Sequence, residues 1–539
     1  MSDQILISRP GSVSFRVLWR LTIGQWTVFF VILGIVARFV RFAVRFPLSA
    51  DEFMLAANLL DRGPLELLRP LDHNQVAPAG FLWIEWAAVQ LFGFSEYSLR
   101  LFAAVCGIAS VILFRHLAGR LLRGTALVFA VAIFSVAYYP LRYAAEIKPY
   151  ASDCFVGLLL LAIAVEWWRD RDRVQWLWLL VLLAPVGLAI SFPAVFVAGG
   201  IILAMSWSLW KERQTGRARL SLLAWLALCA AVVATFVGLQ RLTFSAQYDA
   251  ARQIMTSCWA DSFPPWQRPV DLAAWLIVAH TSEMFAYPVG AENGGSLLTA
   301  LCFAAGLWAA CRRARPEPAF AIAAFFVLSL VAAALHRYPY GGHARLSQYL
   351  APSICLLAGL GAARFLARIR RPEWQAAGQR AVMLACVVIG SFLIVRDLTK
   401  PWQSAIERDH RDFARTFWAQ SAEIPTYCLN ADLGVTAYES NFDPGYLCYR
   451  RIYSVVPPGR EVKPGGPVPA IDRPLRCVSF HSEIAPRNDV VLARWMEEMS
   501  SRYDQVDVTS HEVRDQVRSW YDVYWFRPKQ LALVNRQSD

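Results

Sequence analysis

The sequence predicts a polytopic α-helical membrane protein with an extracytoplasmic α/β domain at its C-terminal end. Three observations support this fold class. The 539-residue chain has a mean hydropathy of +0.37, and only 17% of its residues are charged, whereas soluble proteins carry about 25%. Long apolar runs recur up to residue 396, and basic clusters separate them at every second connection. Beyond residue 396 hydropathy falls, and Pro, Asp and Glu become common.

About eleven apolar runs qualify as membrane spans, since about 20 helical residues cross the hydrocarbon core. They are residues 21–44, 99–121, 124–140, 150–168, 175–192, 194–210, 220–241, 296–311, 319–336, 347–367 and 380–396. Residues 1–396 are therefore predicted to form the membrane domain, and residues 397–539 a separate soluble domain.

The basic clusters predict the orientation, because Lys and Arg accumulate in cytoplasmic connections. The clusters are 115–123, 169–173, 211–219, 312–315 and 364–380. These connections and the N-terminus are predicted to face the cytoplasm, and the C-terminus the outside. The net charge of +12 is then mainly a topology signal and does not indicate a nucleic-acid partner.

Three arginines do not follow this orientation rule. Arg38, Arg41 and Arg45 lie at the outer end of the first span, on one helix face. One interpretation is that they snorkel to lipid headgroups. The other is that they attract an anionic headgroup towards the acidic residues that follow.

The C-terminal region has the pattern of an α/β domain. Strands are predicted at 426–430, 477–480 and 522–526, and helices near 403–421 and 487–502. Cys428, Cys448 and Cys477 lie in this region. In an oxidising compartment two of them could form a disulfide, and we predict Cys428 with Cys448, although three pairings are open.

The first outer loop, residues 46–96, begins with an acidic pair. Asp51 and Glu52 lie in the stretch SADEFMLAANLLDR, whose apolar spacing predicts a short interfacial helix. Ionisable residues at a membrane boundary are functional candidates by default. The alternative is that Ser49 and Glu52 form a capping box while Asp51 complements the helix dipole. Further along the loop, Trp83 and Trp86 are typical of a helix at the membrane interface.

Other outer loops bring polar clusters to the same side of the membrane. The first loop adds His73 and Asn74, and the loop before the tenth span adds His343, Arg345 and Gln348. The loop after the third span carries another set, namely Arg142, Tyr143, Glu146, Lys148, Tyr150 and Asp153. We expect these clusters to converge on one site.

Convergence would assemble the groups needed for glycosyl transfer from a lipid phosphate. A carboxylate can act as general base on an acceptor hydroxyl. Lys148, Arg345 and Arg142 can bind a phosphate. Two unit charges about 4 Å apart interact by about 4 kcal/mol at an effective dielectric near 20, which favours a phosphate as leaving group.

Each site residue also has a structural alternative. Lys148 and Arg345 could be interfacial anchors, and Asp153 could compensate a helix dipole or pair with Lys148. His73 and His343 are candidates for acceptor binding or support. No His, Asp or Glu spacing matches a known metal motif, but scattered outer-loop ligands could hold one divalent ion.

The first outer loop and its flanks also resemble a known family. The Asp-Glu pair after the first span, HNQVAPAGFLWIEW and FGFSEYSLRLFAAVCG are similar to segments of GT-C superfamily glycosyltransferases. The nearest group is glycosyltransferase family 39, which includes protein O-mannosyltransferases and aminoarabinose lipid A transferases. The resemblance is clearest from residue 45 to 155, extends to YGGHARLSQYLAP, and does not cover the C-terminal domain.

The resemblance implies roles for individual residues. Asp51 matches the acidic residue proposed as catalytic base in the family, Glu52 matches its partner, and Asp153 falls where many members carry a second acidic residue. Lys148 and Arg345 are matched by loop and not by a strict motif. The family uses polyprenyl-phosphate sugars as donors and acts on the periplasmic or lumenal side.

These observations predict an enzyme of the bacterial inner membrane, with its active site facing the periplasm or cell exterior. It would transfer a sugar from a polyprenyl-phosphate donor to an extracytoplasmic protein, lipid or glycan by direct inverting displacement. The alternatives are a transporter or flippase for a lipid-linked or anionic solute, and a non-catalytic scaffold. Transporters tend to show internal repeats and charged or broken helices near the midplane. Here the polar residues cluster in outer loops and no repeat is evident, which favours an enzyme.

Overall fold

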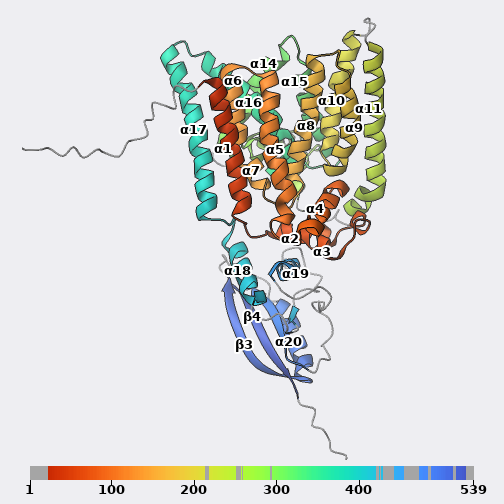
Figure 1. The fold of residues 1–539 in the computed structure, drawn as a ribbon, viewed down its shortest axis with the longest axis vertical. Coiled ribbons are helices and arrows are strands. Elements are labelled where there is room, and N and C mark those ends of the chain that lie inside the picture. The colour runs from red at the N-terminus through yellow and green to blue at the C-terminus, as the bar shows by residue number, and fades with distance from the viewer. Residues whose placement is uncertain are drawn as a thin grey trace, which may run out of the picture.

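The computed structural model describes residues 22–212, 218–249, 257, 259–291, 294–419, 424, 426–428, 442–453, 473–482, 487–513 and 518–529. Within these ranges the chain forms a large bundle of apolar helices with a small α/β domain at one end of it (Figure 1). The predicted fold class is confirmed.

A helix lies over each of the eleven predicted spans. They are α1 (Ile23–Ala43), α5 (Ser98–Leu121), α6 (Gly124–Ser135), α8 (Tyr150–Arg169), α9 (Gln175–Ile190), α10 (Ala194–Glu212), α11 (Ala218–Leu239), α14 (Gly295–Cys311), α15 (Glu317–Ala334), α16 (Ala351–Ala367) and α17 (Pro372–Thr399). Among the described residues, eight helical stretches are long and apolar enough to cross a membrane, while α6, α9 and α14 are shorter apolar helices. The predicted span 124–140 ends early because the extended backbone at Ala137 separates α6 from α7 (Tyr138–Tyr143).

Glycine lets the central helices approach closely. A Cβ at Gly306 of α14 would collide with the carbonyl of Leu357 in α16, and one at Gly361 of α16 with the carbonyl of Cys302. Small residues at helix contacts are typical of membrane bundles, where close van der Waals packing stabilises association. This packing fixes α16, and with it the segment that precedes α16 at the outer end of the bundle.

The basic connections gather at the end of the bundle that lies away from the α/β domain (Figure 1). Arg313 donates to the carbonyl of Leu121 at 2.7 Å, and Arg315 donates to that of Arg169 at 2.8 Å. Arg171 pairs with Glu317 at 3.0 Å. Cations therefore satisfy helix C-terminal carbonyls at the predicted cytoplasmic end.

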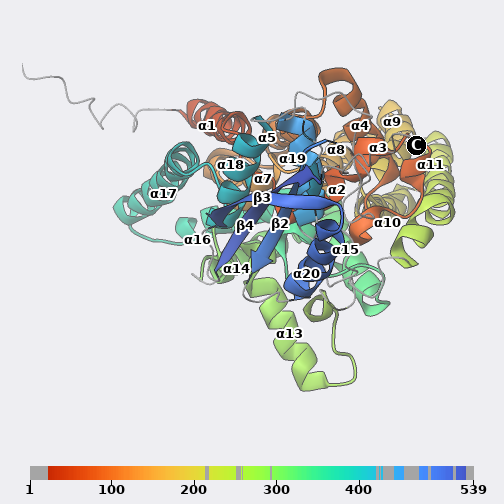
Figure 2. The same cartoon turned by 90° about the horizontal axis from the view of Figure 1, so that it is seen from below.

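Short helices occupy the connections on the opposite side, and the first of them along the chain lie next to the α/β domain (Figure 1). They are α2 (Ala50–Ala56), α3 (Asn58–Asp61), η2 (Glu66–Leu68), η3 (Asp72–Asn74), α4 (Ala79–Phe92), α7, η4 (Gln240–Phe244), η5 (Ala260–Ser262), α13 (Pro269–Thr281), η6 (Glu283–Phe285) and η8 (Ala344–Leu350). The predicted helix after Ser49 is thus present as α2 and α3. Figure 2 shows α13 projecting sideways from the bundle.

The environment of the arginines at the outer end of α1 differs from the predicted one. Arg38 and Arg41 are each 1% exposed, so neither snorkels nor reaches a lipid headgroup. Arg38 donates to the carbonyl of Ser135 at 2.9 Å, and Arg41 Nη1 donates to both carboxylate oxygens of Asp397 in α17 at 3.0 Å. Only Arg45 is exposed, over the ring of Tyr97. The spacing showed a shared helix face, but that face packs against other helices.

The C-terminal domain contains a four-stranded sheet in the order β1-β2-β4-β3, with β1 parallel to β2 and the other pairs antiparallel. Its elements are α18 (Ala405–Ala419), β1 (Thr426–Cys428), α19 (Phe442–Tyr453), β2 (Leu475–Ser482), α20 (Arg487–Ser500), β3 (Tyr503–Val513) and β4 (Ser519–Pro528). The three predicted strands correspond to β1, β2 and β4, and the two predicted helices to α18 and α20. Residues 429–430 of the first predicted strand lie outside the described residues, whereas α19 and β3 were not predicted.

Side chains on the two faces of the sheet pack into two different hydrophobic cores. Val478, Tyr521 and Val523 pack towards α18 and the first outer loop, whereas Leu475, Cys477 and Phe526 pack towards Trp495 and Met499 of α20. The side chain of Cys428 lies outside the described residues, so its disulfide with Cys448 stays a prediction. The predicted domain boundary at residues 396 and 397 falls in the last turn of α17 and likewise stays a prediction.

The C-terminal domain docks on the first outer loop. The backbone N–H of Leu48 donates to the Tyr449 hydroxyl at 3.2 Å, and the Phe53 and Tyr449 rings lie 4.8 Å apart. Both contacts flank the acidic pair in α2. The domain is therefore packed against the segment that carries the predicted catalytic residues.

Candidate active site

The acidic pair occupies the first turn of α2. The backbone N–H of Ser49 donates to Glu52 Oε2 at 3.0 Å, so Glu52 closes the N-terminus of this helix as a capping residue. Asp51 lies in the same turn but is 47% exposed, while Glu52 is 1% exposed. The two neighbouring carboxylates therefore have different environments.

Glu52 is held by a buried ion pair. Arg100 of α5 donates from Nε to Glu52 Oε1 at 2.8 Å and from Nη2 to Oε2 at 2.7 Å. The backbone N–H of Ile147 also donates to Oε1, at 3.1 Å. Glu52 thus ties α2 to α5 and to the residue preceding Lys148. Because its oxygens are occupied, this geometry favours a positioning role over direct contact with substrate.

Asp51 pairs with Arg345 across a sequence separation of 294 residues. Arg345 Nη1 lies 2.5 Å from Asp51 Oδ2. Arg345 is 31% exposed, so both partners remain accessible to a ligand. The structure thus brings together two residues that were predicted from separate loops.

Aromatic and polar side chains orient Arg345. Its guanidinium lies 4.4 Å from the centroid of the Trp259 ring, a cation–π distance. Trp259 also contacts His343, with ring centroids 4.9 Å apart. Glu283 accepts the backbone N–H of Ala344 at 2.8 Å and fixes the start of η8. His343 therefore lies beside Arg345, near the site.

Lys148 enters the site from the loop between α7 and α8. It is 7% exposed, and its Nζ donates to Gln75 Oε1 at 2.7 Å. Gln75 in turn donates to the carbonyl of His73 at 3.2 Å. His73 and Asn74 adopt left-handed backbone angles, with φ of 57° and 53°. The HNQ segment thus forms a tight turn that presents Gln75 to the lysine.

Arg142 lies on α7, and Glu146 holds it. Arg142 Nε donates to Glu146 Oε1 at 2.8 Å, and Gln403 Nε2 donates to the same oxygen at 2.7 Å. Arg142 is 30% exposed, whereas Glu146 is 7% exposed. The guanidinium is therefore anchored on one side and accessible on the other.

The cations lower the pKa of Asp51. Lys148 makes the largest contribution and Arg345 and Arg142 add to it, although burial acts in the opposite direction. Burial lowers the pKa of Lys148, which Asp51 partly offsets. The pKa of Arg345 is raised, because Tyr150 and Asp51 outweigh its burial. One carboxylate thus interacts with three cations from two other loops, as the prediction of convergence requires.

Two predicted support residues lie apart from this cluster. Asp153 is 4% exposed in the first turn of α8, and its Oδ1 has no hydrogen-bond partner among the described residues. His73 lies beside the ion pair between Arg62 and Asp72. Burial lowers the pKa of His73; the charge of Asp72 acts in the opposite direction, and that of Arg62 adds to the lowering. Neither residue makes a described contact with Asp51. Their roles stay predictions.

Several site residues were missed by sequence reasoning. Arg100 and Gln75 lie in the segments that resemble GT-C glycosyltransferases, and Gln403 lies outside them, but none was assigned a role, because each acquires its role from a distant partner. Glu85 of α4 was also not singled out, although no described contact links it to the Asp51 cluster; it is fully buried, and neither carboxylate oxygen has a partner among the described residues. The sequence feature that could have identified Glu85 is its position as an ionisable residue within an apolar run.

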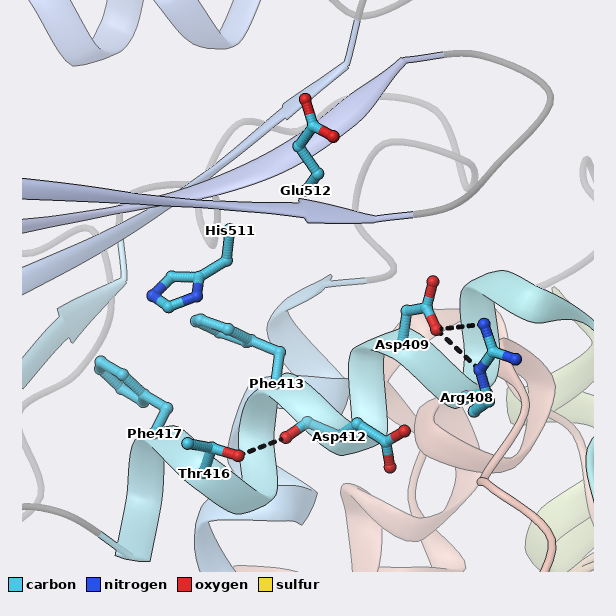
Figure 3. Close-up of a pocket in the computed structure, with 8 residues that line it drawn as sticks. All are labelled: Arg408, Asp409, Asp412, Phe413, Thr416, Phe417, His511 and Glu512. Atoms are coloured by element: carbon cyan, nitrogen blue, oxygen red, sulfur yellow. Dashed lines mark hydrogen bonds and ion pairs between the residues drawn. The ribbon is translucent and has the colours of Figure 1, made fainter.

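The part of the chain that the structure describes contains no group of three or more His, Cys, Asp or Glu residues placed to hold a metal. A pocket of about 490 Å³ lies elsewhere, between α18 and the end of β3 (Figure 3). Asp412 and Glu512 are among the residues that line it, and Arg408 pairs with Asp409 at 2.7 Å. This pocket is separate from the Asp51 cluster.

Comparisons with known proteins show which sequence family and which folds this chain resembles. Residues 76–238 match the family model of dolichyl-phosphate-mannose-protein mannosyltransferases. Two solved structures of ArnT from Cupriavidus metallidurans, one bound to undecaprenyl phosphate and one in the apo state, have TM-scores of 0.53 and 0.52. Each is 15% identical, and each alignment covers 93% of this chain and 98% of the ArnT chain.

A further solved structure is less similar. The oligosaccharyltransferase AglB from Archaeoglobus fulgidus is 10% identical and has a TM-score of 0.48, over 95% of this chain and 75% of AglB. The comparison with curated proteins found no match. The fold similarity to ArnT, the family-model match and the apolar helices together show an integral membrane protein that has the GT-C fold and resembles the GT-C glycosyltransferases.

Proposed function

We propose that the protein transfers a sugar from a polyprenyl-phosphate donor to a hydroxyl-bearing acceptor outside the cytoplasm. The observation that carries this proposal is the accessible ion pair between Asp51 and Arg345, with Lys148 and Arg142 within electrostatic range of the same carboxylate. A general base beside a cationic cluster suits a reaction that deprotonates an alcohol and releases a phosphate.

In the proposed reaction the acceptor oxygen attacks the anomeric carbon of the donor sugar. The bond between that carbon and the phosphate oxygen breaks, and its electron pair leaves with the lipid phosphate. Asp51 orients the acceptor hydroxyl and takes its proton. Because attack and departure occur on opposite faces, the configuration at the anomeric carbon inverts.

The cationic side chains stabilise the phosphate that leaves. Arg345 presents a planar donor pair that suits phosphate oxygens, and Lys148 presents a compact charge. A donor phosphate that recruits Arg345 draws it away from Asp51. Losing that neighbour raises the pKa of Asp51 and makes it a stronger base. Donor binding would therefore activate the base.

Glu52, Asp153, His73 and His343 are assigned supporting roles. Glu52 fixes α2 through Arg100, and His343 lies beside Arg345. Trp83 is 43% exposed on α4 and would contact the polyprenyl chain or surrounding lipid. The orientation of the basic connections supports a site facing the periplasm or exterior of a bacterial cell. The undecaprenyl phosphate in the ArnT structure supports the donor class.

The test is transfer by the purified full-length protein in proteoliposomes. A panel of polyprenyl-phosphate sugars is offered together with cell-envelope extract, and labelled product and released lipid phosphate are measured. Release of lipid phosphate coupled to labelling of an acceptor is expected for at least one donor. Transbilayer movement of intact donors without cleavage would instead indicate a flippase and would overturn the proposal.

A further inference from the structure

We propose that the C-terminal domain forms part of the donor site, and that Gln403 is a positioning residue for Arg142. This inference rests on the proposed function, because it assigns Arg142 to the donor phosphate. Gln403 lies in the segment between α17 and α18, residues 400–404, which joins the membrane helices to the soluble domain. The structural reason is a shared hydrogen-bond acceptor.

That acceptor is Oε1 of Glu146. It receives Arg142 Nε at 2.8 Å and Gln403 Nε2 at 2.7 Å. A carboxylate oxygen has two lone-pair sites, so these two donors saturate it. Glu146 thereby binds Arg142 through Nε and leaves the two terminal nitrogens of the guanidinium for a phosphate. Gln403 contributes to this arrangement without adding charge.

A second contact fixes the backbone of Arg142. Arg41 donates from Nε to the Arg142 carbonyl at 3.4 Å, while its Nη1 pairs with both oxygens of Asp397. Arg41 and Asp397 are 1% and 2% exposed. The end of α17 therefore contacts Arg142 through Arg41, and the following segment contacts it through Glu146. The position of the arginine depends on both.

The same domain also contacts the carboxylate side of the site. The Tyr449 hydroxyl accepts the backbone N–H of Leu48, three residues before Asp51. Arg411 of α18 donates to the carbonyl of Arg45 at 2.6 Å. A domain that contacts both the base-bearing helix and the phosphate-binding arginine sets the distance between them. Its role is thus to position the site.

The chemistry predicts graded effects at position 403. Gln403→Leu removes the amide and leaves Glu146 with Arg142 alone. Gln403→Glu places a second carboxylate against Glu146, and the extra negative charge competes with the donor phosphate for Arg142. We expect Gln403→Glu to raise the donor KM about tenfold with little change in kcat, the scale expected for one added charge near a partly exposed site. Gln403→Leu should have a smaller effect in the same direction.

The experiment measures donor KM, kcat and thermal unfolding of the full-length protein in proteoliposomes. Gln505→Glu is the matched control, since Gln505 is an exposed residue of β3 in the same domain. A normal melting temperature with a raised donor KM only at position 403 supports the inference. An unchanged donor KM in Gln403→Glu, or a lower kcat accompanied by a lower melting temperature, overturns it.

Binding of a short-chain polyprenyl phosphate separates this inference from the proposed function. If the wild-type protein binds the lipid but transfers no sugar, the proposed function fails and the binding constants still decide the role of Gln403. Weaker binding by Gln403→Glu than by Gln505→Glu then supports positioning. Equal binding by the two variants refutes it. A wild-type protein that binds no lipid phosphate overturns both proposals.

Discussion

Glu52 and Arg100 form a buried bidentate ion pair whose atoms lie 2.7 and 2.8 Å apart. This pair connects α2 with α5, and through Ile147 it also reaches the loop that carries Lys148. The half-exposed Asp51 is the residue next to Glu52. One buried carboxylate therefore holds the base and a phosphate-binding lysine in a fixed relation.

Arg100→Met is expected to destabilise the protein. Removing one partner of a buried pair leaves an uncompensated charge, which costs about 3–5 kcal/mol. Thermal unfolding in detergent should show a clearly lower melting temperature, and Glu52→Gln combined with Arg100→Met should recover part of it. Arg268→Met is the control, because its pair with Asp271 is exposed. Equal melting temperatures for the Arg100 and Arg268 variants would refute the role of the buried pair.

Lys148→Met should change the pH profile of transfer. Lys148 contributes most to the low pKa of Asp51, so its removal raises that pKa. Because the base must be ionised, activity should then be lost at a higher pH as the solution is acidified. The residual activity of Lys148→Met is followed against pH beside that of Lys529→Met, an exposed-site control. An acidic limb that stays in place, or moves to lower pH, would contradict this electrostatic account.

Arg345→Lys tests the geometry of the phosphate contact. Lysine keeps the charge but loses both the planar donor pair and the stacking on Trp259 at 4.4 Å. We expect a donor KM about tenfold higher, since a partly desolvated cation–π contact contributes on the order of 1–2 kcal/mol. Steady-state kinetics with varied donor give this value. Kinetics identical to wild type would show that charge alone is sufficient.

Glu85→Leu is expected to stabilise the protein. Glu85 is buried without a described partner for either oxygen, and an unpaired polar group in an apolar environment is costly. The melting temperature in detergent should therefore rise by several degrees. A lower melting temperature would show that Glu85 makes a stabilising contact, and loss of transfer at unchanged stability would assign it to the reaction.

The sequence was most informative where a pattern is local. Apolar runs predicted a helix at every proposed span, and the strands predicted in the C-terminal region correspond to β1, β2 and β4. The strand β3 was missed because nine of its eleven residues, between Tyr503 and Val513, are exposed, so it lacks a buried face to produce alternation. Pairing with β4 determines its structure instead.

Long-range partners could not be predicted. The outer position of Arg41 suggested lipid contact, but Arg41 is buried in an ion pair with Asp397, which lies 356 residues away in the sequence. The sequence did not indicate the roles of Arg100 and Gln403, because each role depends on a distant partner. That partner is Glu52 for Arg100 and Glu146 for Gln403. Charged residues in outer loops could be recognised as candidates for one site, whereas their pairing depends on how the helices pack.

The central claim is that Asp51 is the base of a glycosyl transfer, and Asp51→Asn tests it most directly. The variant keeps the size of the side chain and removes its basicity, and membrane insertion and lipid-phosphate binding serve as controls for folding. With labelled polyprenyl-phosphate sugar in proteoliposomes, transfer is predicted to fall by at least about 100-fold while both controls stay normal. Turnover close to that of the wild type would contradict the account.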